Sequence, residues 1–186
     1  MINSLNDLEF EEYRAVIFDC FGTLIETPVR KNPYLYLMKK KNILNKENIQ
    51  KIMKESVSFA EIGNGLYWRD IELANKMLEE ELSAMKIYND VLPILKRISD
   101  KRIKTLVCSN LAVNYKEVLN LIPISEKVLS FEIGFIKPQK EIYELCIHKL
   151  GFKSSEILFV GDSYTCDVVG PKNVGMSAIF LNRLKI

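Results

Sequence analysis

Short apolar runs alternate with longer amphipathic stretches along most of this chain, and the pattern predicts an α/β protein. The apolar runs have the length of strands, and the stretches between them repeat apolar residues at helical spacing. The expected strands are residues 16–18, 103–108, 128–132, 157–161 and 176–181. The expected helices among them are residues 90–100, 113–121, 138–150 and 166–173. Strict alternation of the two is typical of a parallel sheet with helices on both faces.

One region breaks the alternation and predicts helices only. Residues 33–42 have a helical pattern, and Asn45 is placed to cap a second helix that ends at the glycines near residue 64. A third helix has its apolar side at Ile71, Ala74, Leu78, Leu82 and Met85. We therefore expect an all-helical insert over residues 26–85, inside a core domain made of residues 1–25 and 86–186. Residues 1–13 are expected to be a short helix or arm.

Two of the expected strands end at a carboxylate. Asp19 follows the run Val16–Phe18, and Asp162 follows the run 157–161. Gly22 permits a tight turn directly after Asp19. Because ligands of open α/β sheets bind at the carboxyl ends of the strands, these residues mark a candidate site.

Four segments in fixed order resemble the motifs of the haloacid dehalogenase superfamily. They are Asp19-Cys20-Phe21-Gly22-Thr23, then Ser109-Asn110, then Lys137 before Pro138, and finally Gly161-Asp162-Ser163 with Asp167 four residues later. Each segment is weak evidence alone, but the ordered set spans almost the whole chain. The resemblance implies a Rossmann-like, doubly wound parallel sheet, in which the helical insert is a small cap that closes over a small substrate.

The resemblance also implies a role for each matching residue. Asp19 would be the nucleophile, with Lys137 and Asp167 as the other catalytic residues, and Thr23, Ser109 and Asn110 would bind substrate. The resemblance also places Asp19 beside Asp162. Two neighbouring carboxylates repel each other, and a divalent cation bound between them removes that repulsion. Mg²⁺ prefers oxygen ligands and commonly completes its shell with waters and a substrate phosphate. Its expected protein ligands are Asp19, Asp162 and the backbone carbonyl of Phe21.

Phe21 departs from the pattern of the family's phosphatases, which have a second aspartate at that place. In them the second aspartate protonates the leaving alcohol and then activates water, a contribution worth roughly 10²–10⁴-fold. We therefore expect a phosphatase that is slow on alkyl esters, or one that prefers aryl or acyl phosphates, whose leaving groups need no proton.

Two alternatives remain open at this point. A 2-haloacid dehalogenase resembles this chain in the aromatic residue at position 21 and needs no general acid, but it lacks a metal-binding carboxylate at the fourth motif. A non-catalytic binder of phosphorylated ligands would keep the metal and phosphate groups without turnover. The retained Asp162 favours the phosphatase.

Composition adds few constraints. The chain has 186 residues and a net charge of +2, with no basic stripe of the kind that binds nucleic acid. No apolar run approaches a membrane span, and residues 1–14 do not resemble a secretion signal, so we expect a cytoplasmic protein. No protein partner is evident, and the expected ligand is a small phosphorylated substrate.

The histidine and the cysteines are expected to be structural. His148 should lie on a helix surface, away from Ile142, Leu145 and Cys146. The four cysteines lack the spacing of a zinc site, and small buried side chains are the simpler interpretation. They are Cys20, Cys108, Cys146 and Cys166.

Overall fold

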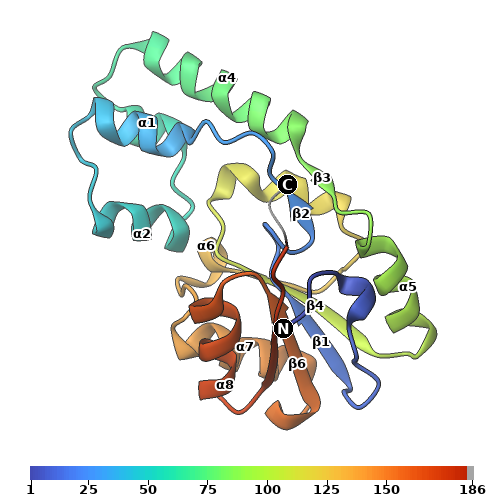
Figure 1. Ribbon diagram of the computed structural model, residues 1–186. Helices are drawn as coiled ribbons and strands as arrows, with labels where there is room; N and C mark the ends of the chain where they lie inside the picture. The colour runs from blue at the N-terminus through green and yellow to red at the C-terminus, as the bar shows by residue number, and fades with distance from the viewer. Residues whose placement is uncertain (184–186) are drawn as a thin grey trace.

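A five-stranded parallel sheet forms the centre of the computed structural model, which describes residues 1–183 (Figure 1). The strands lie in the order β5-β4-β1-β6-β7. Their bounds are β1 Ala15–Phe18, β4 Lys104–Ser109, β5 Lys127–Leu129, β6 Ile157–Gly161 and β7 Ser177–Phe180. The middle strand, β1, pairs in parallel with β4 and β6, so Phe18 lies opposite Val107 and Val160. The predicted α/β sheet is confirmed.

The central strand is apolar on both faces because both faces are covered by helices. Val16 and Phe18 belong to a core shared with helix α5 (Val91–Asp100) and the N-terminal turn η1 (Leu5–Asp7). Ala15 and Ile17 point to the opposite core, against helix α7 (Lys140–Leu150). The short helix α8 (Gly170–Asn173) packs on α7. A four-residue helix, α6 (Ser130–Ile133), follows β5, and a 3-10 turn, η3 (Ser154–Glu156), precedes β6.

Four helices form the predicted helical segment between two short strands. The helices are α1 (Pro33–Lys40), α2 (Lys46–Lys54), α3 (Phe59–Gly63) and α4 (Trp68–Ala84). Strands β2 (Ile25–Glu26) and β3 (Lys86–Ile87) pair antiparallel at its base. The segment has an apolar cluster of its own, and Figure 1 shows it set apart from the sheet and joined to it through β2 and β3. Its treatment as a separate domain stays a prediction.

Some local expectations were wrong. The stretch from Asn45 to Gly63 is two helices, because Ser58 and Glu61 form a capping box that starts a new one. Residues Val113–Leu121 form a 3-10 helix, η2, and α7 begins at Lys140, two residues after Pro138. On α7, Leu145 is exposed and Tyr143 takes the expected place in the core.

The helix expected over residues 166–173 also differs. A π-helical turn, η4 (Tyr164–Val169), comes before α8. The hydroxyl of Tyr143 donates to the carbonyl of Cys166, and the Asp167 carboxylate accepts from the backbone N–H of Ser163. These bonds tie the turn to α7 and to Ser163, the residue before it.

The strand expected over residues 128–132 ends at Leu129, where α6 begins, whereas the expectations for the histidine and for three of the four cysteines agree with the structure. His148 lies on the exposed side of α7. Cys20, Cys108 and Cys146 are buried free thiols, and Cys166 is a half-buried one. Within residues 1–183, no helix is both long and apolar enough to cross a membrane.

Candidate active site

Three neighbouring strands bring the predicted residues to one edge of the sheet. Asp19 directly follows β1, Ser109 is the last residue of β4, and Asp162 directly follows β6. Because β1 lies between β4 and β6, Asp19 is at the centre of this edge. The backbone N–H of Asp19 still donates to the carbonyl of Val160 at 2.9 Å, so the sheet itself fixes the carboxylate's position.

The turn after Asp19 folds tightly against Asp162. Gly22 has a φ of 81°, which a residue with a side chain rarely adopts. A Cβ atom at this position would lie 2.2 Å from Oδ2 of Asp162, so glycine is also required by space. Thr23 is buried in the same turn, and its hydroxyl donates to Oδ2 of Asp19 at 3.4 Å.

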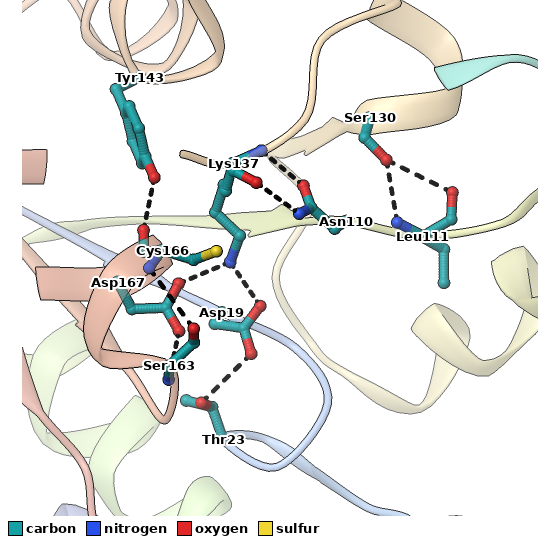
Figure 2. A network of polar contacts seen from close by, with 10 residues as sticks. All are labelled: Asp19, Thr23, Asn110, Leu111, Ser130, Lys137, Tyr143, Ser163, Cys166 and Asp167. Atoms are coloured by element: carbon teal, nitrogen blue, oxygen red, sulfur yellow. Dashed lines mark hydrogen bonds and ion pairs between the residues drawn. The ribbon is translucent and has the colours of Figure 1, made fainter. Parts of the chain in front are cut away.

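A buried lysine joins two of the predicted carboxylates (Figure 2). The Nζ atom of Lys137 is 2.6 Å from Oδ1 of Asp19 and 2.7 Å from Oδ1 of Asp167. The second oxygen of Asp167 accepts from the backbone N–H of Ser163 at 2.9 Å. We call Asp19, Lys137 and Asp167 the ion-pair centre. All three side chains are largely removed from water, so each charge depends on the others.

Burial and charge act in opposite directions on these groups. Burial raises the pKa of Asp19 to about 6, although the Lys137 ammonium acts to lower it. Burial alone would lower the pKa of Lys137, but Asp19 and Asp167 outweigh it and raise that pKa well above its usual value. Lys137 is therefore a fixed positive charge at the strand ends.

The structure places Asn110 behind Lys137. Its side-chain Nδ2 donates to the carbonyl of Lys137 at 2.9 Å, and its Oδ1 accepts from the N–H of the same residue at 2.7 Å (Figure 2). Asn110 thus holds the lysine backbone in place. Its predicted contact with substrate stays a prediction.

Ser109 has an unused hydroxyl. The side chain is buried, and its Oγ atom has no hydrogen-bond partner among the residues that the structure describes. An unpaired buried hydroxyl costs free energy unless something else bonds to it. Its place at the end of β4, next to β1, suits a ligand oxygen near Asp19.

The acidic residues of the site suit a hard cation. One carboxylate oxygen each from Asp19, Asp162 and Asp167 lie within 4.8 Å of one another. Asp19 and Asp167 each bond to Lys137 and to a second group, whereas the exposed carboxylate of Asp162 bonds to none of the described residues and is the freest of the three. Burial, followed by the charge of Asp167, raises the pKa of Asp162, as expected for carboxylates crowded without a cation. Oxygen ligands of this kind fit Mg²⁺.

Phe21 lies in a different environment from its neighbours in the turn. Its half-buried ring meets Tyr115 edge-on, with 6.1 Å between ring centroids. Tyr115 lies 6.4 Å from Tyr34 of α1, which in turn packs against Phe59 of α3. We call these four rings the aromatic seam. They connect the turn after Asp19 with the helical segment.

Hydrogen bonds run beside the aromatic seam. Tyr115 donates to the buried carboxylate of Glu81 on α4. Glu81 also accepts from the backbone N–H groups of Lys31 and Asn32. The Tyr34 hydroxyl has Val57 and Asn114 as its partners. Sequence reasoning missed Tyr115 and Glu81. The one available signal was the acidic residue three positions after Leu78, inside the apolar stripe of α4.

Comparisons with known proteins identify the relatives of this chain. The family model for haloacid dehalogenase-like hydrolases matches residues 13–175. A glyceraldehyde 3-phosphate phosphatase of Methanopyrus kandleri is 33% identical over 112 residues, which are 58% of this chain and 48% of that protein. The chain thus matches only about half the length of this curated relative.

Two solved structures have the same fold. One is a HAD family enzyme from Bacteroides thetaiotaomicron in complex with magnesium and inorganic phosphate, with a TM-score of 0.69 and 19% identity. The match covers 94% of this chain and 96% of that one. The other is a 2-haloacid dehalogenase from Pseudomonas syringae, with a TM-score of 0.65, 20% identity, and coverage of 90% and 86%. Likeness at this identity concerns the fold alone.

Proposed function

The chain belongs to the haloacid dehalogenase-like hydrolases, and from that premise we propose that it is a magnesium-dependent phosphatase of a small phosphorylated metabolite. The observation that carries the proposal is the ion-pair centre, where a buried ammonium lies 2.6 Å from the carboxylate that ends the central strand. The curated relative is a phosphatase of glyceraldehyde 3-phosphate, which is a substrate of this size.

In the proposed reaction, Asp19 is the nucleophile. One of its oxygens attacks the phosphorus atom, and the bond to the ester oxygen breaks, which leaves an aspartyl-phosphate and an oxyanion that takes its proton from water. Water then attacks the phosphorus, which restores Asp19 and releases inorganic phosphate. Lys137 holds a positive charge beside both the nucleophile and the phosphoryl group, and the Ser109 hydroxyl donates to a phosphoryl oxygen. The Thr23 hydroxyl, which donates to Asp19 in the structure, turns to a phosphoryl oxygen when the ester is bound.

A magnesium ion would be held by Asp19, Asp162 and the carbonyl of Phe21. This carbonyl accepts no hydrogen bond from the described residues, so it is available as a ligand. When bound, the ion supplies positive charge to the phosphoryl oxygens and relieves the repulsion between the carboxylates. The helical segment is proposed as the cap that limits the size of the substrate.

The residue at position 21 determines which phosphate esters we expect the protein to prefer. Phe21 can neither protonate an alkoxide nor activate water, so alkyl esters should react slowly and aryl or acyl phosphates faster. The effect should lie within the roughly 10²–10⁴-fold that general acid-base catalysis contributes.

Phosphate release tests the proposal. The protein should be assayed with glyceraldehyde 3-phosphate, an acyl phosphate and an aryl phosphate, in magnesium and in excess chelator. We expect turnover that requires magnesium and that falls about 10²-fold or more in Asp162→Asn, since a bound metal contributes several kcal/mol. Asp7→Asn, an exposed site, is the matched control. Full activity in chelator would contradict the metal's role.

A 2-haloacid dehalogenase is the second candidate, favoured by the aromatic Phe21. Asp162, which this reaction does not need, is crowded against Asp19 and argues against it. We expect no halide release from 2-chloropropionate. Release that persists in chelator and disappears in Asp19→Asn would reverse this ranking. Binding of phosphate esters without any turnover would instead identify a non-catalytic binder.

A further inference from the structure

A polar cavity of about 1050 Å³ opens beside the candidate active site. It lies where the helical segment joins the sheet region. Gly22 and Asp162 form its inner wall, while Arg30 comes from the chain entering the segment and Lys86 and Tyr88 from the chain leaving it. Because the Asp162 carboxylate belongs to the acidic group around Asp19, the cavity starts at the site itself.

Most charges that face this cavity are already paired. Lys86 lies 3.2 Å from Glu26 across the β2–β3 pair. Arg183 lies 2.9 Å from Asp90, and its guanidinium stacks on the ring of Tyr88 at 3.7 Å. These contacts balance two cations with two carboxylates.

Arg30 is the cation of the cavity without such a pair among the described residues. Its guanidinium donates to the hydroxyl of Thr27 at 3.3 Å, and no carboxylate of residues 1–183 lies within ion-pair distance of it. The side chain is exposed and lines the same cavity as Asp162.

The cavity is placed and sized for the alcohol part of a substrate. Small-molecule sites commonly enclose roughly 300–1,000 Å³ with a few placed polar groups. Asp162 lines the cavity and has a carboxylate oxygen within 4.8 Å of one of Asp19, so a small ester whose phosphoryl group is at Asp19 could extend into the cavity. Arginine binds carboxylates in a planar, two-point arrangement, and one guanidinium charge matches a monoanion better than a second phosphate.

We propose that Arg30 binds a carboxylate on the alcohol part of the substrate, so that among alkyl phosphates the small monoesters of hydroxy acids are preferred. This inference rests on the phosphatase proposal for the same site. It assigns Arg30 to substrate selection and gives it no part in the chemical steps.

Two esters of nearly equal size test the inference. Phosphoglycolate carries the carboxylate, and ethyl phosphate has a methyl group in its place. In magnesium, we expect kcat/KM of the parent protein to favour phosphoglycolate by about 10-fold or more, a typical effect of one charged hydrogen-bonded pair. In Arg30→Ala this ratio should fall by about the same factor, mainly through KM, and Arg30→Lys should restore part of it.

Lys31→Ala is the matched control. It removes the same charge one residue further along, where the lysine pairs with Glu80 on α4. The ratio should stay at the parent value in this variant. Equal use of the two esters by the parent, or an equal loss of preference in Lys31→Ala, would overturn the role of Arg30.

Binding measurements separate this inference from the phosphatase proposal. Calorimetry on Asp19→Asn, with and without Arg30→Ala, gives the dissociation constants of both esters without turnover. Tighter binding of phosphoglycolate that depends on Arg30 supports the inference even if the parent protein releases no phosphate. Turnover of both esters without any such difference in binding would overturn the inference and leave the phosphatase proposal intact.

Discussion

Asp19 and Phe21 are two residues apart in the chain, yet they belong to two regions that are built differently. Asp19 is part of the ion-pair centre, whose three charges come from the sheet region and whose bonds are 2.6 and 2.7 Å long. Phe21 is part of the aromatic seam, whose other rings come from η2 and from the helical segment. The side chain of Asp19 is therefore held by ion pairs, and the side chain of Phe21 by packing against aromatic rings.

This difference explains why one turn can keep a nucleophile and lack a general acid. Both bonds of the ion-pair centre join residues of the sheet region, so they do not depend on which side chains the helical segment supplies. The ring at position 21 packs against Tyr115, which bonds to Glu81 of α4. Substitutions in the first region should mainly change activity and charge balance, and those in the second should change how the helical segment is held.

The largest expected effect is the loss of turnover in Asp19→Asn. Loss of a covalent nucleophile commonly lowers kcat by about 10⁴-fold or more. The variant should remain folded, because Lys137 keeps its bond to Asp167. Phosphate release is the measurement, and Asp100→Asn, at an exposed ion pair with Lys96, is the control. Residual activity above a tenth of the parent value would exclude Asp19 as the nucleophile.

Lys137→Met should show that the charges of the ion-pair centre depend on each other for stability. The substitution leaves two buried carboxylates without their cation, and breaking a buried pair in this way costs about 3–5 kcal/mol. Urea unfolding at neutral pH measures the loss. Lys140→Met removes an exposed lysine paired with Glu144 and should cost less than about 1 kcal/mol. Equal losses of stability in the two variants would show that the charges of the ion-pair centre do not depend on each other.

Phe21→Asp moves an acid into the aromatic seam. Turnover of an alkyl phosphate should rise by about 10²-fold, the lower end of the range for general acid catalysis, and by less for an aryl phosphate. An alkoxide leaving group gains most from protonation. Loss of the contact with Tyr115 should lower the melting temperature, so both quantities are measured on one preparation. A folded variant with no gain on the alkyl ester would show that Phe21 is not simply a lost acid.

Tyr115→Phe should have the smallest effect. It keeps the ring in the seam and removes only the hydroxyl that donates to Glu81. A hydrogen bond to a buried charged group contributes about 1.5 kcal/mol at the lower end of its range. Chemical unfolding should show this loss, whereas Tyr67→Phe, at a ring that is 82% exposed, should show none. Equal stability of the two variants would show that the hydrogen bond from Tyr115 to Glu81 does not stabilise the aromatic seam.

The carboxylates at the strand ends could be predicted from local patterns, whereas Lys137 and Asp167 of the ion-pair centre were expected only from the resemblance of their motifs. Asp19 and Asp162 each come after an apolar run, and Gly22 marks the turn. Parallel pairing of the runs then brings their ends together, which the register of β1 with its neighbours confirms. The role of Asn110 was less accessible, since its two bonds to Lys137 join residues 27 positions apart.

The aromatic seam could not be predicted in this way. Tyr115 meets Glu81 only because the helical segment lies over η2, and no local pattern sets that position. The same holds for Arg30, whose importance comes from which neighbouring charges are already paired. Contacts between segments depend on how the whole chain packs and cannot be predicted from one stretch of sequence. The residue at the end of a strand can, because it follows from the pattern of that strand alone.

The most direct test of the account is to trap the phosphoryl group on Asp19. Phe21 cannot activate water, so the second step should be slow once an aryl leaving group has departed without help. Rapid acid quenching with 4-nitrophenyl phosphate, followed by mass spectrometry, should find one phosphoryl group on the peptide that contains Asp19, together with an initial burst of nitrophenol. Phosphate release without phosphoryl transfer to that peptide, or transfer to another residue, would contradict the account.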